Sequence, residues 1–189
     1  MQPGHRRVSA PDRDAFAAIV EEQQVAVYNL CYRMLGDPHL AEDAAQETFL
    51  RAFRARHRFD PSRPARTWVL SIAAHHCIDA LRRRARLMWL PMGDRPLADP
   101  GPGPEATLLQ SEAEAELREV LERLKPDERA AIVLRYWHDL SIEEIAEVTD
   151  ASPDAVRTRL YRARRRLASA DLAPAKPEGG EWRDEPRAV

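Results

Sequence analysis

The sequence predicts an all-α protein of two small helical domains joined by a flexible Pro/Gly linker, the second domain containing a helix-turn-helix. Apolar residues recur at helical spacing, and no segment alternates with the period of two that a strand requires. Proline and glycine interrupt the helical pattern at residues 90–108. The 189 residues suffice for two helical modules, each of roughly 70 residues.

Breaks in the pattern set the expected boundaries. The parts are a first domain over 12–89, a linker over 90–108, a second domain over 109–172 and a disordered tail over 173–189. Within the first domain, Gly36 suits a helix C-terminus, while Asp37 and Pro38 suit the N-cap and first position of the next helix. An extended linker could reach about 60 Å at ~3.3 Å per residue, so the domains can occupy well-separated sites.

The second domain carries the start signals of consecutive helices. Pro126 is placed to open one helix, Ser141 begins an S-x-x-E capping box, and Ser152 precedes a first-turn proline. In the last helix an apolar stripe is expected to pack inward, formed by Val156, Leu160, Ala163 and Leu167. The spacing therefore predicts a compact helix pair.

The outward face of the last helix predicts DNA binding. This helix contains six arginines and a single acid, Asp154. Guanidinium groups match guanine edges and phosphates, so this face suits the major groove. A salt-bridged surface helix is the alternative, and it would need more acids at i±4 than this helix has. The candidate residues are Arg157, Thr158, Arg159, Tyr161, Arg162, Arg164 and Arg165.

In the first domain, the helix after Pro38 divides into two faces. The inward face is expected to comprise Ala41, Ala45, Phe49, Ala52 and Phe53. The outward stripe comprises Asp43, Gln46, Glu47 and Leu50. An acidic stripe with an exposed leucine invites a protein partner, and an ordinary solvated face is the open alternative.

A long helix is predicted from Thr67 to Arg86. Its core positions are Leu70, Ala74, Cys77 and Leu81. The opposite side carries Ser71, His75, Asp79, Arg82 and Arg86, with Arg83 in the terminal arginine run. Such a basic helix end can bind phosphates or complement its own helix dipole. The adjacent His75 and His76 point in different directions, so no metal site is expected.

Composition excludes several classes of protein. The 29 basic and 31 acidic residues nearly cancel, although they are segregated along the chain. Cys31 and Cys77 lie in apolar helical patterns, which indicates buried reduced thiols. No apolar run reaches the ~20 residues of a membrane span, so we expect no membrane insertion and a cytoplasmic location. Catalytic and cofactor motifs are absent, so neither enzyme activity nor a cofactor is expected.

Three sequence segments carry a family resemblance. Residues 41–53 (AEDAAQETFLRAF) closely resemble the polymerase-binding region 2 of extracytoplasmic-function sigma factors, a group of the sigma-70 family. Residues 67–73 (TWVLSIA) and 78–83 (IDALRR) look like the helix of that family that reads the promoter −10 element. Residues 140–146 (LSIEEIA) and 156–164 (VRTRLYRAR) are similar to region 4, which reads the −35 element.

The resemblance implies an alternative sigma factor that binds core RNA polymerase and directs promoter recognition, DNA opening and transcription initiation. It implies that Asp43, Gln46 and Glu47 contact the clamp helices of the largest polymerase subunit. It also implies that the chain contacts the flap of the polymerase. It also implies promoter DNA as a partner and an anti-sigma factor that masks both domains. A free-standing helix-turn-helix regulator is the alternative function, but it would not need the stripe on the first domain.

The chain departs from the family pattern at two points. The family often has Arg-Asn where this sequence has Ala74 and His75. It also often has glycine where this sequence has Asp139, in the turn before Leu140. The first departure puts the identity of the −10 base contact in question, and the second is expected to be the milder change.

Overall fold

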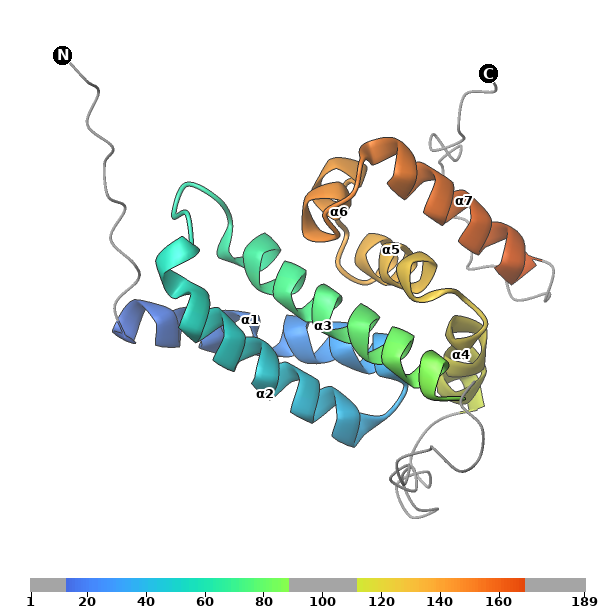
Figure 1. The fold of residues 1–189 in the computed structure, drawn as a ribbon, viewed down its shortest axis with the longest axis horizontal. Helices are drawn as coiled ribbons and strands as arrows, with labels where there is room; N and C mark the ends of the chain where they lie inside the picture. Colours follow the sequence, from blue (N-terminus) through green and yellow to red (C-terminus); the bar gives the residue numbers. More distant parts are fainter. Residues whose placement is uncertain (1–12, 89–111, 169–189) are drawn as a thin grey trace.

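The computed structural model describes residues 13–88 and 112–168, which form helices and contain no strand (Figure 1). The all-α prediction is confirmed there. The expected linker and tail lie outside the described residues. The helices are α1 (Arg13–Leu35), α2 (Pro38–Ala55), the short 3₁₀ helix η1 (Arg56–Arg58), α3 (Ala65–Met88), α4 (Glu112–Glu122), α5 (Pro126–Tyr136), α6 (Ile142–Val148) and α7 (Pro153–Ala168).

Helices α1, α2 and α3 pack together as the first domain. The inward face of α1 buries Val27, Leu30, Cys31 and Met34, which follow helical spacing. Gly36 then adopts φ +75°, a left-handed conformation that glycine permits at little cost. The Asp37 carboxylate accepts a hydrogen bond of 2.9 Å from the Leu40 amide and caps α2, as predicted.

In the second domain, α7 packs against α5 and α6. Ser141 forms the predicted capping box with Glu144, and Ser152 accepts a hydrogen bond of 3.2 Å from the Ala155 amide at the start of α7. The predicted stripe of α7 is buried, as Val156, Leu160, Ala163 and Leu167 are all at most 3% exposed. The helix-turn-helix is therefore present.

The two domains also contact each other, through α5 and α6 on α3 and through α5 on α1 (Figure 1). Their buried apolar residues form one continuous cluster. Arg129 of α5 is 5% exposed and donates a hydrogen bond of 2.6 Å to the Met34 carbonyl at the end of α1. Burial lowers the pKa of Arg129. Proline and glycine in the linker gave no indication of this contact.

Candidate nucleic-acid and polymerase interfaces

The outward stripe of α2 is largely available to a partner. Asp43, Gln46 and Leu50 are exposed, Leu50 to 52%. Glu47 is half-buried and forms an ion pair of 2.7 Å with Arg51, one helical turn later. The hydrogen bond from Arg51 lowers the pKa of Glu47. The stripe thus presents a fixed negative charge next to an exposed leucine.

The inward face of α2 is rotated from the predicted one. Ala41 and Ala52 are buried as predicted, but Ala44 and Thr48 are buried as well, Ala45 and Phe49 are only half-buried, and Phe53 is 38% exposed. Its ring instead packs edge-on against Phe16 of α1, with centroids 5.3 Å apart. The face is rotated because small residues allow α1 and α3 to approach α2 closely, and Phe53 is displaced to the rim.

The stripe borders an apolar groove between α1 and α2. Val20, Val25, Tyr28 and Phe49 line it, together with the predicted contact residue Gln46. Val25 is 65% exposed, so α1 extends the apolar surface beside the stripe. The sequence analysis missed this part of α1. Its exposed valine stands out only once the buried face of α1 is known.

Helix α3 presents the predicted second set of residues. His75, Asp79, Arg82, Arg83 and Arg86 are exposed, and Ser71 is half-buried. The Nδ1 atom of His75 lies 2.8 Å from the Ser71 carbonyl oxygen, so that edge of the ring is directed back along the helix and the other edge is available.

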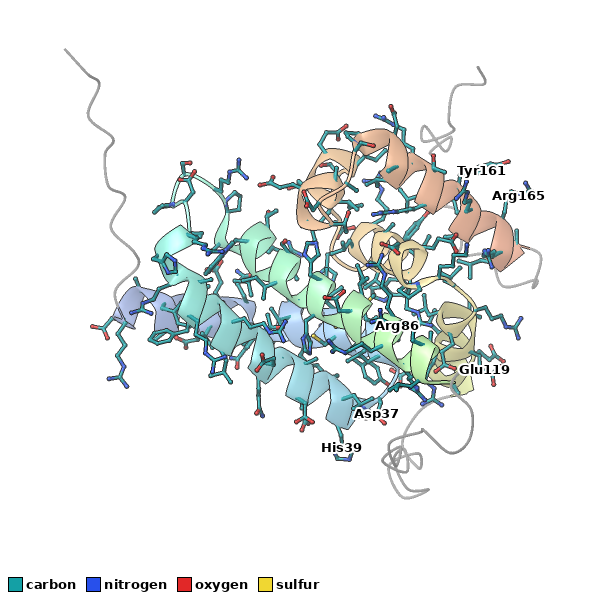
Figure 2. The ribbon with its side chains drawn as sticks, in the orientation of Figure 1. Asp37, His39, Arg86, Glu119, Tyr161 and Arg165 are labelled. Carbon is teal, nitrogen blue, oxygen red and sulfur yellow. The ribbon has the colours of Figure 1, made fainter. Side chains whose placement is uncertain are left out.

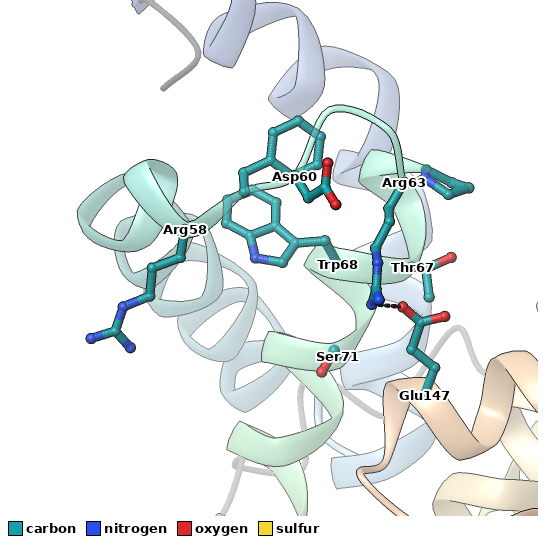
Figure 3. Close-up of a pocket in the computed structure, with 9 residues that line it drawn as sticks. Arg58, Asp60, Arg63, Thr67, Trp68, Ser71 and Glu147 are labelled. Carbon is teal, nitrogen blue, oxygen red and sulfur yellow. Dashed lines mark hydrogen bonds and ion pairs between the residues drawn. The ribbon is translucent and has the colours of Figure 1, made fainter. Parts of the chain in front are cut away.

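A pocket of about 310 Å³ lies at the start of α3, next to Ser71 of this face (Figure 3). The rings of Phe59 and Trp68 form one wall, with centroids 4.9 Å apart, and Arg58 and Arg63 stand at its edges. Aromatic rings beside guanidinium groups suit an unstacked nucleobase and its phosphate. The sequence analysis missed this pocket because the loop before α3 showed no periodic signal.

The arginine face of α7 is partly exposed and partly tied to its own domain. Tyr161, Arg162 and Arg165 are exposed, as Figure 2 shows for Tyr161 and Arg165. Arg157, Thr158, Arg159 and Arg164 are half-buried and hold partners.

The partners of these arginines come from several helices. Arg157 pairs with Asp154 at 2.8 Å and with Glu143 of α6 at 3.7 Å. Arg159 lies 3.5 Å from Asp127 of α5. Arg166 pairs with Glu128 of α5. Counting acids within α7 alone therefore understated the available carboxylates, although Arg162 and Arg165 remain on the exposed face.

Comparison with known proteins shows the family of the chain. The model of sigma-70 region 2 matches residues 19–87, and that of sigma-70 region 4 matches residues 114–167. The ECF RNA polymerase sigma factor SigW of Bacillus subtilis is 36% identical over 86% of this chain and 91% of its own length. The chain belongs to the extracytoplasmic-function group of the sigma-70 family. It is an alternative sigma factor that directs transcription initiation.

Other relatives agree. The sigma-H factor of Pseudomonas aeruginosa is 32% identical over 87% of this chain and 90% of its own length. Among solved structures, CnrH in complex with the cytosolic domain of CnrY is 29% identical, with a TM-score of 0.62, and covers 87% of this chain and 92% of that one. RpoE in complex with NepR from Bartonella quintana, 21% identical with a TM-score of 0.63 over 82% of this chain and 94% of that one, shares the fold.

The two departures from the sigma-factor pattern now have physical explanations. Ala74 is fully buried, so an arginine would not fit there without repacking, whereas His75 remains exposed. Asp139 adopts φ +55°, a left-handed conformation that glycine adopts freely and that aspartate tolerates better than most residues. The turn therefore keeps its shape at a small cost.

Two expectations concern ions and membranes. No group of side chains suited to a metal ion occurs among residues 13–88 and 112–168, and no helix there is long and apolar enough to cross a bilayer. In the same ranges Cys31 and Cys77 are buried and free.

Proposed function

We propose that this sigma factor uses separate surfaces for polymerase and for promoter DNA during initiation. The stripe of Asp43, Gln46, Glu47 and Leu50 contacts the clamp helices of core RNA polymerase, and the second domain contacts the flap. The face of α3 engages the −10 element, and the face of α7 engages the −35 element. The proposed factor binds no cofactor, catalyses no reaction itself and works in the cytoplasm, where its polymerase is.

The observation that carries the proposal is the arrangement of α7. A fully buried stripe fixes the helix in its domain, and Tyr161, Arg162 and Arg165 stand exposed on the other side. A recognition helix needs one buried face and one exposed face, because its DNA contacts require side chains on a helix that is fixed by packing against its own domain. On α3, the exposed His75 supplies a ring N–H that can donate a hydrogen bond to a base, and the exposed Arg82 supplies a cation that can bind a phosphate.

Reconstitution tests the proposal against a free-standing regulator. The purified chain is mixed with core polymerase and a library of promoter fragments, and run-off transcripts are sequenced. A sigma factor yields transcripts with defined start sites without another sigma factor, whereas a regulator yields none until a holoenzyme is supplied. Transcripts from start sites unrelated to any shared sequence would contradict the proposal.

We also propose that an anti-sigma factor restrains this chain. The support is the likeness to CnrH, which was solved with the cytosolic domain of CnrY. Proteins that co-purify with the chain from its host are added back to the reconstituted run-off reaction. A specific partner should abolish transcription at a one-to-one ratio, and no such protein being recovered from uninduced cells would contradict the proposal.

A further inference from the structure

Glu47 occupies the edge of the α2 stripe that faces α3. The other three members of the stripe are exposed, whereas Glu47 is half-buried, and α2 packs directly on α3. The Glu47 carboxylate interacts electrostatically with Arg51 and Arg54 of its own helix and with His76 of α3. On the other side of α2, Gln46 lines the groove with α1. The stripe therefore spans the width of α2, and its Glu47 edge continues onto α3.

Charged groups from both helices surround His76. Glu47 and Arg51 act on it from α2, and Asp79 and Arg83 act on it from α3 itself. The two α3 residues follow His76 by three and seven positions, so all three lie on one face of that helix. The Glu47 and Arg51 ion pair of 2.7 Å thus stands beside an imidazole that belongs to the neighbouring helix.

The burial of His76 is unusual for a histidine with no structural partner. The ring is half-buried, and its Nδ1 atom is buried without a hydrogen bond to any described residue. An unpaired buried polar atom costs about 1–3 kcal/mol, and an apolar side chain would fill the position without that cost. Nε2 is therefore the nitrogen left to meet a partner. Burial of the ring, and after it the charge of Arg51, lowers the pKa of His76, so the ring is neutral at pH ~7.

The two adjacent histidines of α3 face different parts of the molecule. His75 is exposed on the proposed −10 face, with its Nδ1 atom 2.8 Å from the Ser71 carbonyl oxygen. His76 lies about 100° further around the helix, on the side of α2. A single turn of α3 consequently carries one imidazole toward promoter DNA and another toward the polymerase-binding stripe.

We propose that the polymerase-binding stripe continues onto α3 at His76, and that this imidazole must be neutral for core polymerase to bind. The proposal rests on the proposed contact between Glu47 and polymerase. An acidic stripe fits a basic partner surface. A protonated His76 would offset the Glu47 charge and set a cation against that surface, whereas the neutral ring preserves the charge and offers Nε2 for a hydrogen bond.

Proton linkage gives the proposal a sign. The free factor takes up a proton on His76 as the pH falls below ~6.5, the ordinary pKa of histidine, because the pKa of this ring is lowered. Binding of polymerase requires that proton to leave. Affinity for polymerase is therefore full above that pH and declines below it.

Variants whose side chains do not titrate test the proposal. His76→Gln keeps a polar group at the position, His76→Leu places an apolar one there, and His57→Gln removes an exposed histidine of η1 as the matched control. Each full-length chain is labelled at its N-terminus, and its affinity for core polymerase is measured without DNA from about pH 8 to about pH 5. Circular dichroism at each pH checks that the chain is folded. The polymerase's own titration affects all chains alike, so ratios to wild type isolate His76.

The expected result is a wild-type affinity that falls about three- to tenfold relative to His76→Gln and His76→Leu between pH ~8 and pH ~5, because one proton changes affinity by at most tenfold per pH unit. The His57→Gln chain should follow the wild-type profile throughout. Profiles of the two His76 variants that run parallel to wild type overturn the proposal. A His57→Gln profile as flat as theirs does so as well.

Promoter selection separates the two faces of α3. His76→Gln should keep the wild-type −10 preferences, since its side chain lies toward α2. Altered −10 preferences together with a parallel pH profile would place His76 on the DNA side and overturn the proposal. Wild-type affinity of Glu47→Lys for polymerase would count against the proposed function of the stripe. Weakened binding by Glu47→Lys together with parallel profiles would count against His76 alone.

Discussion

Replacing Arg157 by alanine tests base reading by α7. Arg157 is half-buried near the start of the helix, where recognition helices meet base edges. A bidentate arginine contact to guanine contributes about 1–3 kcal/mol of discrimination. In the free protein Arg157 also holds Asp154 at 2.8 Å, an exposed pair of the kind that contributes ~0.2–1 kcal/mol. That pair is lost in the variant as well, so the net loss on cognate DNA should be about 1–2 kcal/mol, or roughly 5- to 30-fold in affinity.

The assay is a titration of specific and scrambled −35 duplexes at several salt concentrations. Arg157→Ala should weaken the specific duplex by the full amount and the scrambled one by little, while Arg165→Ala should weaken both alike and flatten the salt dependence. Asp154→Asn should free Arg157 and tighten binding modestly. Glu143→Gln should have a smaller effect, because its contact with Arg157 is 3.7 Å. Equal losses on both duplexes for Arg157→Ala would refute the base-reading role.

Three further predictions concern the other surfaces and pH. Glu47→Lys should weaken co-elution with core polymerase while circular dichroism stays unchanged, because this charge reversal breaks a surface ion pair, with Arg51, that contributes little to folding; wild-type affinity would reject the stripe as a polymerase contact. His75→Asn should change one or two −10 positions in selected promoter libraries and leave −35 preferences unchanged; identical −10 preferences would remove His75 from specificity. Burial lowers the pKa of His138 to about 4, so stability should fall by up to ~3 kcal/mol as pH drops from ~6.5 toward 4, where the unfolded chain binds the proton and the folded chain does not. Urea titrations of His138→Gln should show a flatter pH profile over that range, and an unchanged profile would exclude His138 as the cause.

Local signals in the sequence predicted the helix boundaries well. Asp37, Ser141 and Ser152 cap their helices as expected, since a cap depends on residues two or three positions away. The buried stripe of α7 followed from spacing for the same reason. Phe53 was placed wrongly because the rotation of a helix depends on how closely its neighbours approach, which the pattern of one helix does not contain.

Contacts between distant parts of the chain could not be predicted from the sequence pattern. Arg82 and Asp127 are 45 positions apart, and each is an ordinary surface residue within its own helix. Likewise, Phe59 precedes α3 and Trp68 lies within it, and only the turn between them brings their rings together as a wall of one pocket. The assignment of individual residues to polymerase and DNA contacts remains a prediction that the experiments above test.

The arginine contacts to main-chain oxygens bear on how these domains can be exchanged between relatives. Arg129 and Arg66 bind the carbonyls of Met34 and His138, and a carbonyl is present whatever side chain occupies the position. A hybrid protein that takes its second domain from a relative would retain the Met34 acceptor, and substitution at position 138 would retain the other. The carboxylate pairs between the domains, Arg82 with Asp127 and Arg63 with Glu147, have no such tolerance, since each depends on an acid at one position. Substitution of the acids would therefore change how firmly the two domains associate, while the main-chain contacts persist wherever Arg66 and Arg129 are kept.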